Sequence, residues 1–99
     1  LVSPNLNIIN KIKQYKKEGF NIILHTSRNM RTYKNNIGLI NAKTLPVIFK
    51  WLEEHSVPFD EIYVGKPWCG EEGFYIDDKS IRPDEFLSKS YDEIVKIIK

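Results

Sequence analysis

The sequence has little of several features that would at once assign a protein to a class. Its 99 residues contain one cysteine, Cys69, which excludes an intramolecular disulfide and a cysteine-based zinc site and favours a reducing compartment. The net charge of +2 is too small to indicate nucleic acid or an anionic membrane as the partner. No apolar run approaches the length of a membrane span, and no charged leader with an apolar core is recognisable. We therefore expect a cytoplasmic protein that binds neither nucleic acid nor a membrane.

Apolar residues at helical spacing occur in three parts of the chain. The first helix is expected to open with Ser3 as its N-cap and Pro4 at its first position, and to stop at Gly19. A second helix is predicted over residues 44–55, with its first residue as the N-cap. A capping box in residues 90–93 opens the last helix. Because 41% of the residues are hydrophobic, these helices have enough apolar partners for one domain that spans the chain.

Three short apolar runs between the helices predict strands. Residues 20–24 form a near-continuous apolar run, which is typical of a strand buried on both faces, and residues 62–64 form a shorter one. A third strand is predicted within residues 73–78, where β-forming residues lead into two adjacent carboxylates. Residues 30–43 show no clear period and are expected to be a loop with a helical turn near 37–40. Strands that alternate with helices predict an α/β domain with a parallel sheet.

Polar side chains follow each of the three predicted strands. Thr26 and Ser27 come after the first, Lys66 after the second, and Asp77 and Asp78 at the end of the third. Ligands of parallel sheets bind at the carboxyl ends of the strands, so these groups are expected to converge there. Hydroxyl and ammonium groups bind phosphate oxygens, and paired carboxylates suit Mg²⁺. The pattern predicts a site for phosphate and Mg²⁺.

Each of these residues also has a simpler interpretation. Adjacent aspartates are common in solvated turns, Thr26 could cap the segment that follows it, and Lys66 could be a surface lysine. Arg28 and Arg31 could bind an anionic substrate or could lie solvated in a loop. Cys69 has no partner base close to it in sequence and is expected to be unreactive. The phosphate interpretation depends on several of these groups meeting in space.

The order and spacing of the motifs resemble those of a known family. Thr26 after a buried strand, Lys66 in Gly-Lys-Pro, and the pair Asp77 and Asp78 resemble motifs two, three and four of the haloacid dehalogenase-like (HAD) superfamily. The longer stretches TSRNMRTYKNN, TLPVIFKWLEEHSVPFDEIYVGKPWCG and FYIDDKSIRPDEF are similar to a small-phosphatase subgroup associated with capsular polysaccharide biosynthesis. The resemblance covers about residues 8–98, nearly the whole chain.

The resemblance implies a fold, a reaction and a set of site residues. The fold would be a Rossmann-like three-layer α/β sandwich with a mainly parallel sheet, and the reaction a Mg²⁺-dependent phosphomonoester hydrolysis through a phospho-aspartate. The substrate would be a small phosphorylated metabolite, such as a sugar phosphate of surface-polysaccharide synthesis. The implied roles are phosphate binding by Thr26, Ser27, Arg28 and Lys66, catalysis by Thr26 and Lys66, and Mg²⁺ binding by Asp77 and Asp78.

One motif of the family is missing. Its first strand ends in Asp-x-Asp, which supplies the nucleophile and the acid/base, whereas no Asp precedes Asp60 here. In the family that strand lies between the strands that here end at Thr26 and Asp77. Because Thr26, Lys66 and both aspartates are present, we expect it upstream of Leu1. The alternative is a noncatalytic HAD-like domain that binds a phosphorylated ligand or a partner. Residues 27–65 leave no room for a cap domain, so an uncapped site would accept larger substrates or be covered in a homo-oligomer.

Overall fold

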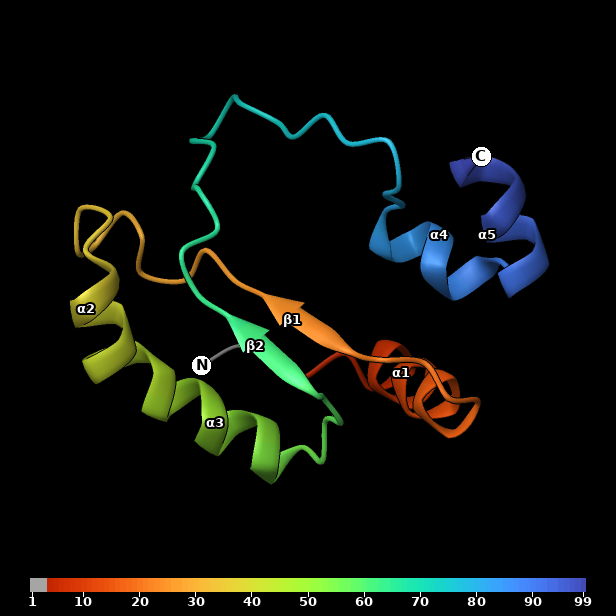
Figure 1. Cartoon of the computed structure of the whole chain (residues 1–99), viewed down its shortest axis with the longest axis horizontal. Helices are drawn as coiled ribbons and strands as arrows, with labels where there is room; N and C mark the ends of the chain where they lie inside the picture. The colour runs from red at the N-terminus through yellow and green to blue at the C-terminus, as the bar shows by residue number, and fades with distance from the viewer. Residues whose placement is uncertain (1–3) are drawn as a thin grey trace.

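The computed structural model describes residues 4–99 and shows an α/β chain built on a parallel pair of strands (Figure 1). Strand β1 (Ile23–His25) pairs with β2 (Glu61–Tyr63), and Leu24 lies opposite Ile62. The helical elements, in chain order, are α1 (Leu6–Lys17), α2 (Ile37–Leu39), the π-helical turn η1 (Ile40–Thr44), α3 (Leu45–Glu54), α4 (Pro83–Ser88) and α5 (Tyr91–Ile98). The predicted α/β class and the parallel pairing are confirmed.

The helices lie on different sides of the two-stranded ribbon. Helix α3 lies beyond β2, whereas α4 and α5 lie beyond β1 (Figure 1). A long arch, residues 64–82, leaves the end of β2 and returns to the start of α4. No helix within residues 4–99 has both the length and the apolar character needed to cross a lipid bilayer.

Helix termini follow the local sequence signals with one correction. The predicted cap Ser3 lies outside the described residues, and α1 begins at Leu6 with Asn5 as its N-cap, so Pro4 is not in its first turn as expected. The Asn5 side chain accepts a hydrogen bond from the amide of Ile8 at 3.2 Å. The predicted stop at Gly19 is confirmed, because this residue takes φ +96° directly after the helix.

The helix predicted over residues 44–55 is confirmed as α3, and helical turns precede it. Asn36 caps α2 by accepting a hydrogen bond from the amide of Leu39 at 3.1 Å, and α2, η1 and α3 then follow without a break. The helical turn expected near 37–40 is also confirmed. Thr44 stands directly before α3 as predicted, but its side chain makes no capping hydrogen bond. Its backbone is helical, and its buried hydroxyl donates to Asn29 Oδ1 at 2.7 Å. Thr44 therefore ties the helix to the loop after β1.

Two strand predictions need correction. The first strand is shorter and later than residues 20–24, and it is not buried on both faces, because the Ile23 side chain is 52% exposed. Residues 73–78 form no strand: Phe74 and Ile76 are 78% and 91% exposed. An extended segment becomes a strand only when another strand satisfies its backbone groups. Among residues 4–99, β1 and β2 pair only with each other.

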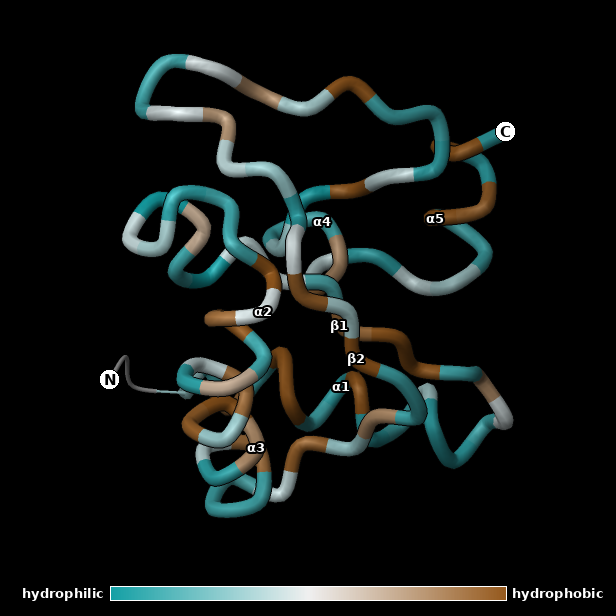
Figure 2. The backbone as a smooth tube through the Cα atoms, turned by 60° about the vertical axis from the view of Figure 1, so that its left-hand side comes forward, coloured by the Kyte–Doolittle hydropathy of each residue, from teal (hydrophilic) through white to brown (hydrophobic). Residues whose placement is uncertain are grey.

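Two contact sets hold the helices together. Five apolar side chains are buried, on α1, on the loop after β1, on the central helical run and on α5: Ile9, Met30, Ile40, Leu52 and Ile94. The tube in Figure 2 shows further hydrophobic residues along both strands. An aromatic cluster joins α1, α4 and α5, with Tyr15 stacked on Phe20 and edge-on to Phe86 and Tyr91. The Lys11 ammonium donates to carbonyls at the end of α4, including Lys89 O at 2.6 Å. A positive charge at this position is favourable, because the C-terminal end of a helix is the negative end of its dipole.

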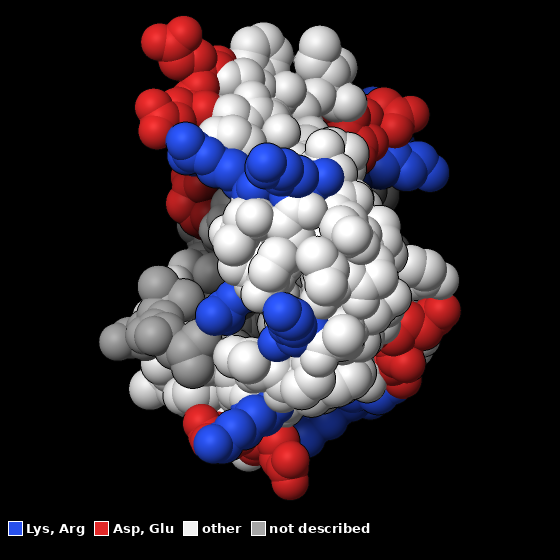
Figure 3. Space-filling view, turned by 90° about the vertical axis from the view of Figure 1, so that its left-hand side faces the viewer, with Lys and Arg blue, Asp and Glu red and all other residues white. Residues whose placement is uncertain are grey.

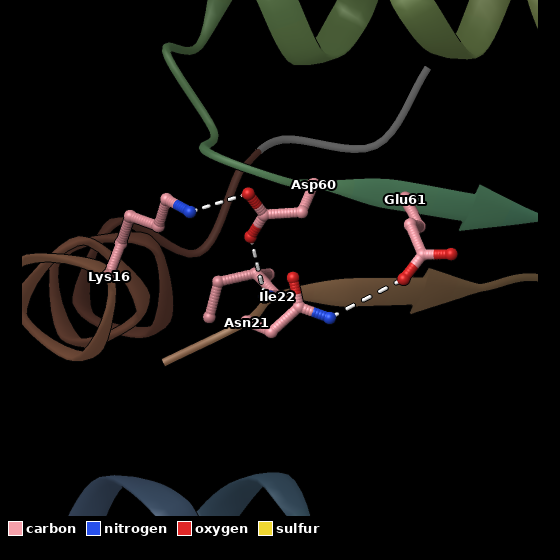
Figure 4. A network of polar contacts seen from close by, with 5 residues as sticks. All are labelled: Lys16, Asn21, Ile22, Asp60 and Glu61. Atoms are coloured by element: carbon pink, nitrogen blue, oxygen red, sulfur yellow. Dashed lines mark hydrogen bonds and ion pairs between the residues drawn. The ribbon is translucent and has the colours of Figure 1, made fainter. Parts of the chain in front are cut away.

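A polar network aligns the first residues of the two strands (Figure 4). Asp60 accepts from Lys16 Nζ at 2.5 Å and from the amide of Ile22 at 2.8 Å, and its own amide donates to Ile22 O at 2.8 Å. The backbone hydrogen bond from Ile22, followed by that from Lys16, holds the pKa of Asp60 below its usual value. Because this end of the ribbon is fixed, the carboxyl ends of β1 and β2 emerge together at the opposite end.

Candidate functional site at the carboxyl ends of the strands

The structure brings Thr26 and Lys66 together directly after the strands. The amide of Thr26 donates to Tyr63 O at 2.9 Å, and the amide of Lys66 donates to Thr26 O at 3.0 Å. Backbone hydrogen bonds between the two segments therefore continue past the last residues of β1 and β2. Thr26 and Lys66 lie side by side at the edge of the sheet where parallel α/β folds bind their ligands.

A cavity of about 780 Å³ joins Lys66 to the arch. Its lining includes Lys66 and Asp77, together with His25 from the end of β1 and Arg82 from the start of α4. Thr26 adjoins this cavity through its backbone contact with Lys66. Lys66 and Asp77, a cation and an anion 11 positions apart in sequence, thus line the same cavity. Its volume suits a small metabolite.

Lys66 is held by the residues around it. Gly65 takes φ +86°, and an added Cβ there would lie 2.7 Å from Ile37 Cδ1, so the turn into Lys66 packs against α2. The Lys66 ammonium lies 4.5 Å from the ring centroid of Tyr75, a distance suited to a cation–π contact. The Tyr75 hydroxyl donates to Pro67 O, which ties the arch to the same turn. The ammonium therefore has a defined place at the cavity wall.

Thr26 has the capping role considered for it. Its hydroxyl oxygen accepts a hydrogen bond from the amide of Arg28 at 3.1 Å, so it does cap the segment that follows. The hydroxyl hydrogen is not used by that bond and can donate to a phosphate oxygen. Ser27 contributes its carbonyl to a turn, accepting from the amide of Met30 at 3.0 Å, and the Arg28 side chain is exposed.

Asp77 and Asp78 are exposed side chains on the arch. A hydrogen bond from the amide of Lys79, at 3.3 Å from Asp77 Oδ1, is the main cause that holds the pKa of Asp77 below its usual value, so this carboxylate is ionised at neutral pH. Within residues 4–99 no three His, Cys, Asp or Glu side chains gather as metal ligands. Mg²⁺ commonly takes one or two protein carboxylates and completes its shell with phosphate and water. Asp77 offers such oxygen donors at the cavity that Lys66 also lines, whereas Asp78 borders a separate hollow beside α5.

Two aromatic residues of the site were missed in the sequence. Tyr75 contacts Lys66, and Trp68 lies against Arg31, whose guanidinium carbon is 4.9 Å from the Trp68 ring centroid. Each aromatic residue is two positions from a predicted site residue, Tyr75 from Asp77 and Trp68 from Lys66. In an extended segment that spacing puts side chains on the same side, which is the signal that could have identified both.

The edge of β1 away from β2 borders an apolar cavity of about 420 Å³. Its walls come from α1, β1 and residues 81–86, and include Ile8, Ile23 and Phe86. The Tyr15 hydroxyl, also at this cavity, is buried without a hydrogen-bond partner among the described residues, and burial raises its pKa. Apolar walls beside an unpaired strand edge are suited to another strand.

Comparisons with known proteins give one informative result. No family model matches the chain, and no curated protein matches it. Among solved structures, the crystal structure of an MCSG target from Vibrio cholerae superposes with a TM-score of 0.96 at 52% sequence identity. The match covers 99% of this chain and 80% of that one. The chain therefore belongs to the same protein family as this Vibrio cholerae protein.

Proposed function

We propose that the protein is a Mg²⁺-dependent phosphatase of the HAD type, which hydrolyses a phosphomonoester through a phospho-aspartate. The observation that carries the proposal is that Lys66 and Asp77 line one cavity while Thr26 is hydrogen-bonded to Lys66 through the backbone. An ammonium, a hydroxyl and a carboxylate from three separate segments are the groups that a phosphate and its metal need.

Each residue has a distinct part in this mechanism. The Thr26 hydroxyl donates to a phosphoryl oxygen, and the Lys66 ammonium stabilises the negative charge that develops there. Ser27 and Arg28 add donors on the same loop. Asp77, with Asp78 beside it in sequence, would hold Mg²⁺, which would supply a Lewis acid for the phosphoryl oxygens. The cation–π contact with Tyr75 keeps the Lys66 ammonium at the cavity.

The nucleophile must be a carboxylate that enters between β1 and the arch. We propose that it belongs to an Asp-x-Asp strand beside the unpaired edge of β1, as the central strand of a three-layer sandwich. Two observations support this position: the apolar cavity at that edge, and the exposed Phe74 and Ile76 on the arch. The added strand would cover both the apolar cavity beside β1 and the exposed apolar side chains of the arch.

The substrate class comes from the resemblance of the sequence to phosphatases of capsular polysaccharide biosynthesis. We propose a small phosphorylated metabolite, and specifically a sugar phosphate of surface-polysaccharide synthesis, in the cytoplasm. A noncatalytic domain that binds a phosphorylated ligand or partner is the second candidate. It would use the phosphate-binding groups of Thr26 and Lys66 and would need no nucleophile.

Phosphate release from an aryl phosphate by the complete native protein, measured across a Mg²⁺ titration, tests the proposal. Lys66→Met keeps the aliphatic stem but removes the cation, so turnover should fall on the order of 10²–10³-fold with little rescue by Mg²⁺. Asp77→Asn removes one negative charge from the metal site, so more Mg²⁺ should be needed and should partly restore the rate.

Lys50→Met is the matched control, because Lys50 is an exposed lysine on α3. It removes the same charge and should keep wild-type turnover. Wild-type turnover in Lys66→Met would show that Lys66 is a surface lysine and would refute the mechanism. Binding of phosphate without any turnover would instead favour the noncatalytic candidate.

A further inference from the structure

We infer that Arg31 and Trp68 form a second anion-binding position at the rim of the phosphate site, and that the substrate carries a carboxylate in addition to its phosphate. The inference rests on the proposed function, because it describes the part of the substrate that remains outside the phosphate pocket. Four observations lead to it: the distribution of charge, the geometry of the pair, the anchoring of its loop and its distance from Lys66.

Positive charge is concentrated in one part of the chain. Residues 19–52 contain five lysines and arginines and no acidic residue, a charge of +5. The other residues carry ten basic and thirteen acidic side chains, a charge of −3. Figure 3 shows the face formed on the α2 side, with lysine and arginine side chains across its middle and acidic ones around its margins. This local excess attracts anions although the whole chain is nearly neutral.

Arg31 is the member of this segment that is best placed to bind a ligand. Its guanidinium carbon lies 4.9 Å from the ring centroid of Trp68, and it takes part in no ion pair among the described residues. Stacking on an aromatic ring uses the flat face of a guanidinium and leaves its in-plane N–H groups free to bind a carboxylate through two parallel hydrogen bonds. Trp68 is itself 45% exposed, so the pair is open to a ligand.

The loop that carries Arg31 is anchored on both sides of it. Met30 is 5% exposed and accepts a hydrogen bond from the amide of Asn35 at 2.8 Å. Asn29, at φ +61°, accepts from the buried hydroxyl of Thr44 at 2.7 Å. Arg31 is therefore presented from a fixed backbone, which reduces the entropy lost when it binds a ligand.

The pair is close to the phosphate site. Trp68 follows Lys66 by two residues, so the Cα atoms of these two residues are at most about 7 Å apart. Arg31 lies on the loop that follows Thr26. The amide of Lys66 donates to Thr26 O, so the two segments start from the same point. A substrate of sugar size could place its phosphate at Lys66 and a carboxylate at Arg31. The chemical class is thus a phosphomonoester of a sugar acid.

Two probes that differ at one carbon test this inference. Glucose 1-phosphate and glucuronic acid 1-phosphate share a ring and a phosphate, but the second has a carboxylate in place of a hydroxymethyl group. Calorimetric titration of the complete native protein should show that the sugar acid binds on the order of 10–100-fold more tightly, as expected for a charge-assisted hydrogen-bonded pair. Arg31→Gln should abolish this preference, and should lower the affinity for glucose 1-phosphate no more than removal of a neighbouring positive charge does.

Lys34→Gln is the matched control, because Lys34 is an exposed residue on the same loop and makes no cation–π contact within residues 4–99. It removes the same charge and should keep the preference. Equal affinities of wild type for the two probes, or an equal loss in Arg31→Gln and Lys34→Gln, would overturn the inference. If wild type does not hydrolyse an aryl phosphate, the proposed function is refuted separately. The titration can still be interpreted in that case, because it measures binding and requires no reaction.

Discussion

Gly65 sets the direction in which the chain enters Lys66, and Gly65→Ala tests this role. The residue has φ +86°, a conformation that costs an L-residue about 1–2 kcal/mol. The new Cβ would also lie 2.7 Å from Ile37 Cδ1, which must move. Ile37 is 41% exposed and the atom is the end of its side chain, so an off-rotamer shift of about 0.5–1.5 kcal/mol relieves the contact. The backbone term is therefore the larger of the two.

A matched glycine separates the two terms. Gly19 has φ +96° and nothing within 4 Å of an added Cβ, so Gly19→Ala should cost only the backbone term. Ile37→Val removes Cδ1 and leaves Cγ1 at 3.8 Å, an ordinary contact. In urea unfolding of the complete native protein, Gly65→Ala should lose about 1.5–3.5 kcal/mol, and the Ile37→Val background should restore only the rotamer term.

The same variants report on the site. Gly65→Ala should lower aryl phosphate turnover more than Gly19→Ala does, because only Gly65 directs Lys66 toward the cavity. Full recovery of stability in the Gly65→Ala, Ile37→Val double variant would show that steric contact, and not backbone conformation, accounts for the cost. That result would refute the assignment of the larger cost to the positive φ of Gly65.

Two further predictions concern Tyr75 and Asp60. Tyr75→Phe keeps the ring beside Lys66, so its aryl phosphate turnover should exceed that of Tyr75→Leu by about 2–5-fold, the value of an exposed cation–π contact; equal rates would exclude this contact as a determinant. The pKa of Asp60 is lower in the folded protein than its ordinary 3.8, so its contribution to stability is present above about pH 4 and is lost as the pH falls through the folded-state pKa. Thermal unfolding from pH 7 to pH 2 should therefore show a steeper acid-side loss in wild type than in Asp60→Asn, and parallel curves would contradict this.

The sequence alone determined features that depend on neighbouring residues. The capping box of Ser90 and Glu93 is present, with hydrogen bonds of 2.9 and 3.3 Å, and Gly19 ends α1 as predicted. The alternation of helices and apolar runs was enough to predict the α/β class and a parallel sheet. These signals work because helix ends and turns are satisfied by groups a few positions away.

The adjacency of Thr26 and Lys66 was also foreseeable, because both follow strands that had to be parallel. That inference needed only the order of elements and the rule for ligand sites in parallel sheets. The roles of Thr26, Lys66 and the aspartates in phosphoryl transfer stay predictions for the turnover experiments.

Tertiary structure decided what depends on distant partners. Thr44 looked like a helix cap, but a buried hydrogen bond to Asn29 uses its hydroxyl, and Asn36 caps the helix instead. Residues 73–78 have the composition of a strand, yet no neighbouring strand pairs with them among residues 4–99. The contact of Tyr75 with Lys66 depends on how the arch returns to the sheet. Strand formation and contacts between loops require partners far along the chain, and local sequence does not specify these.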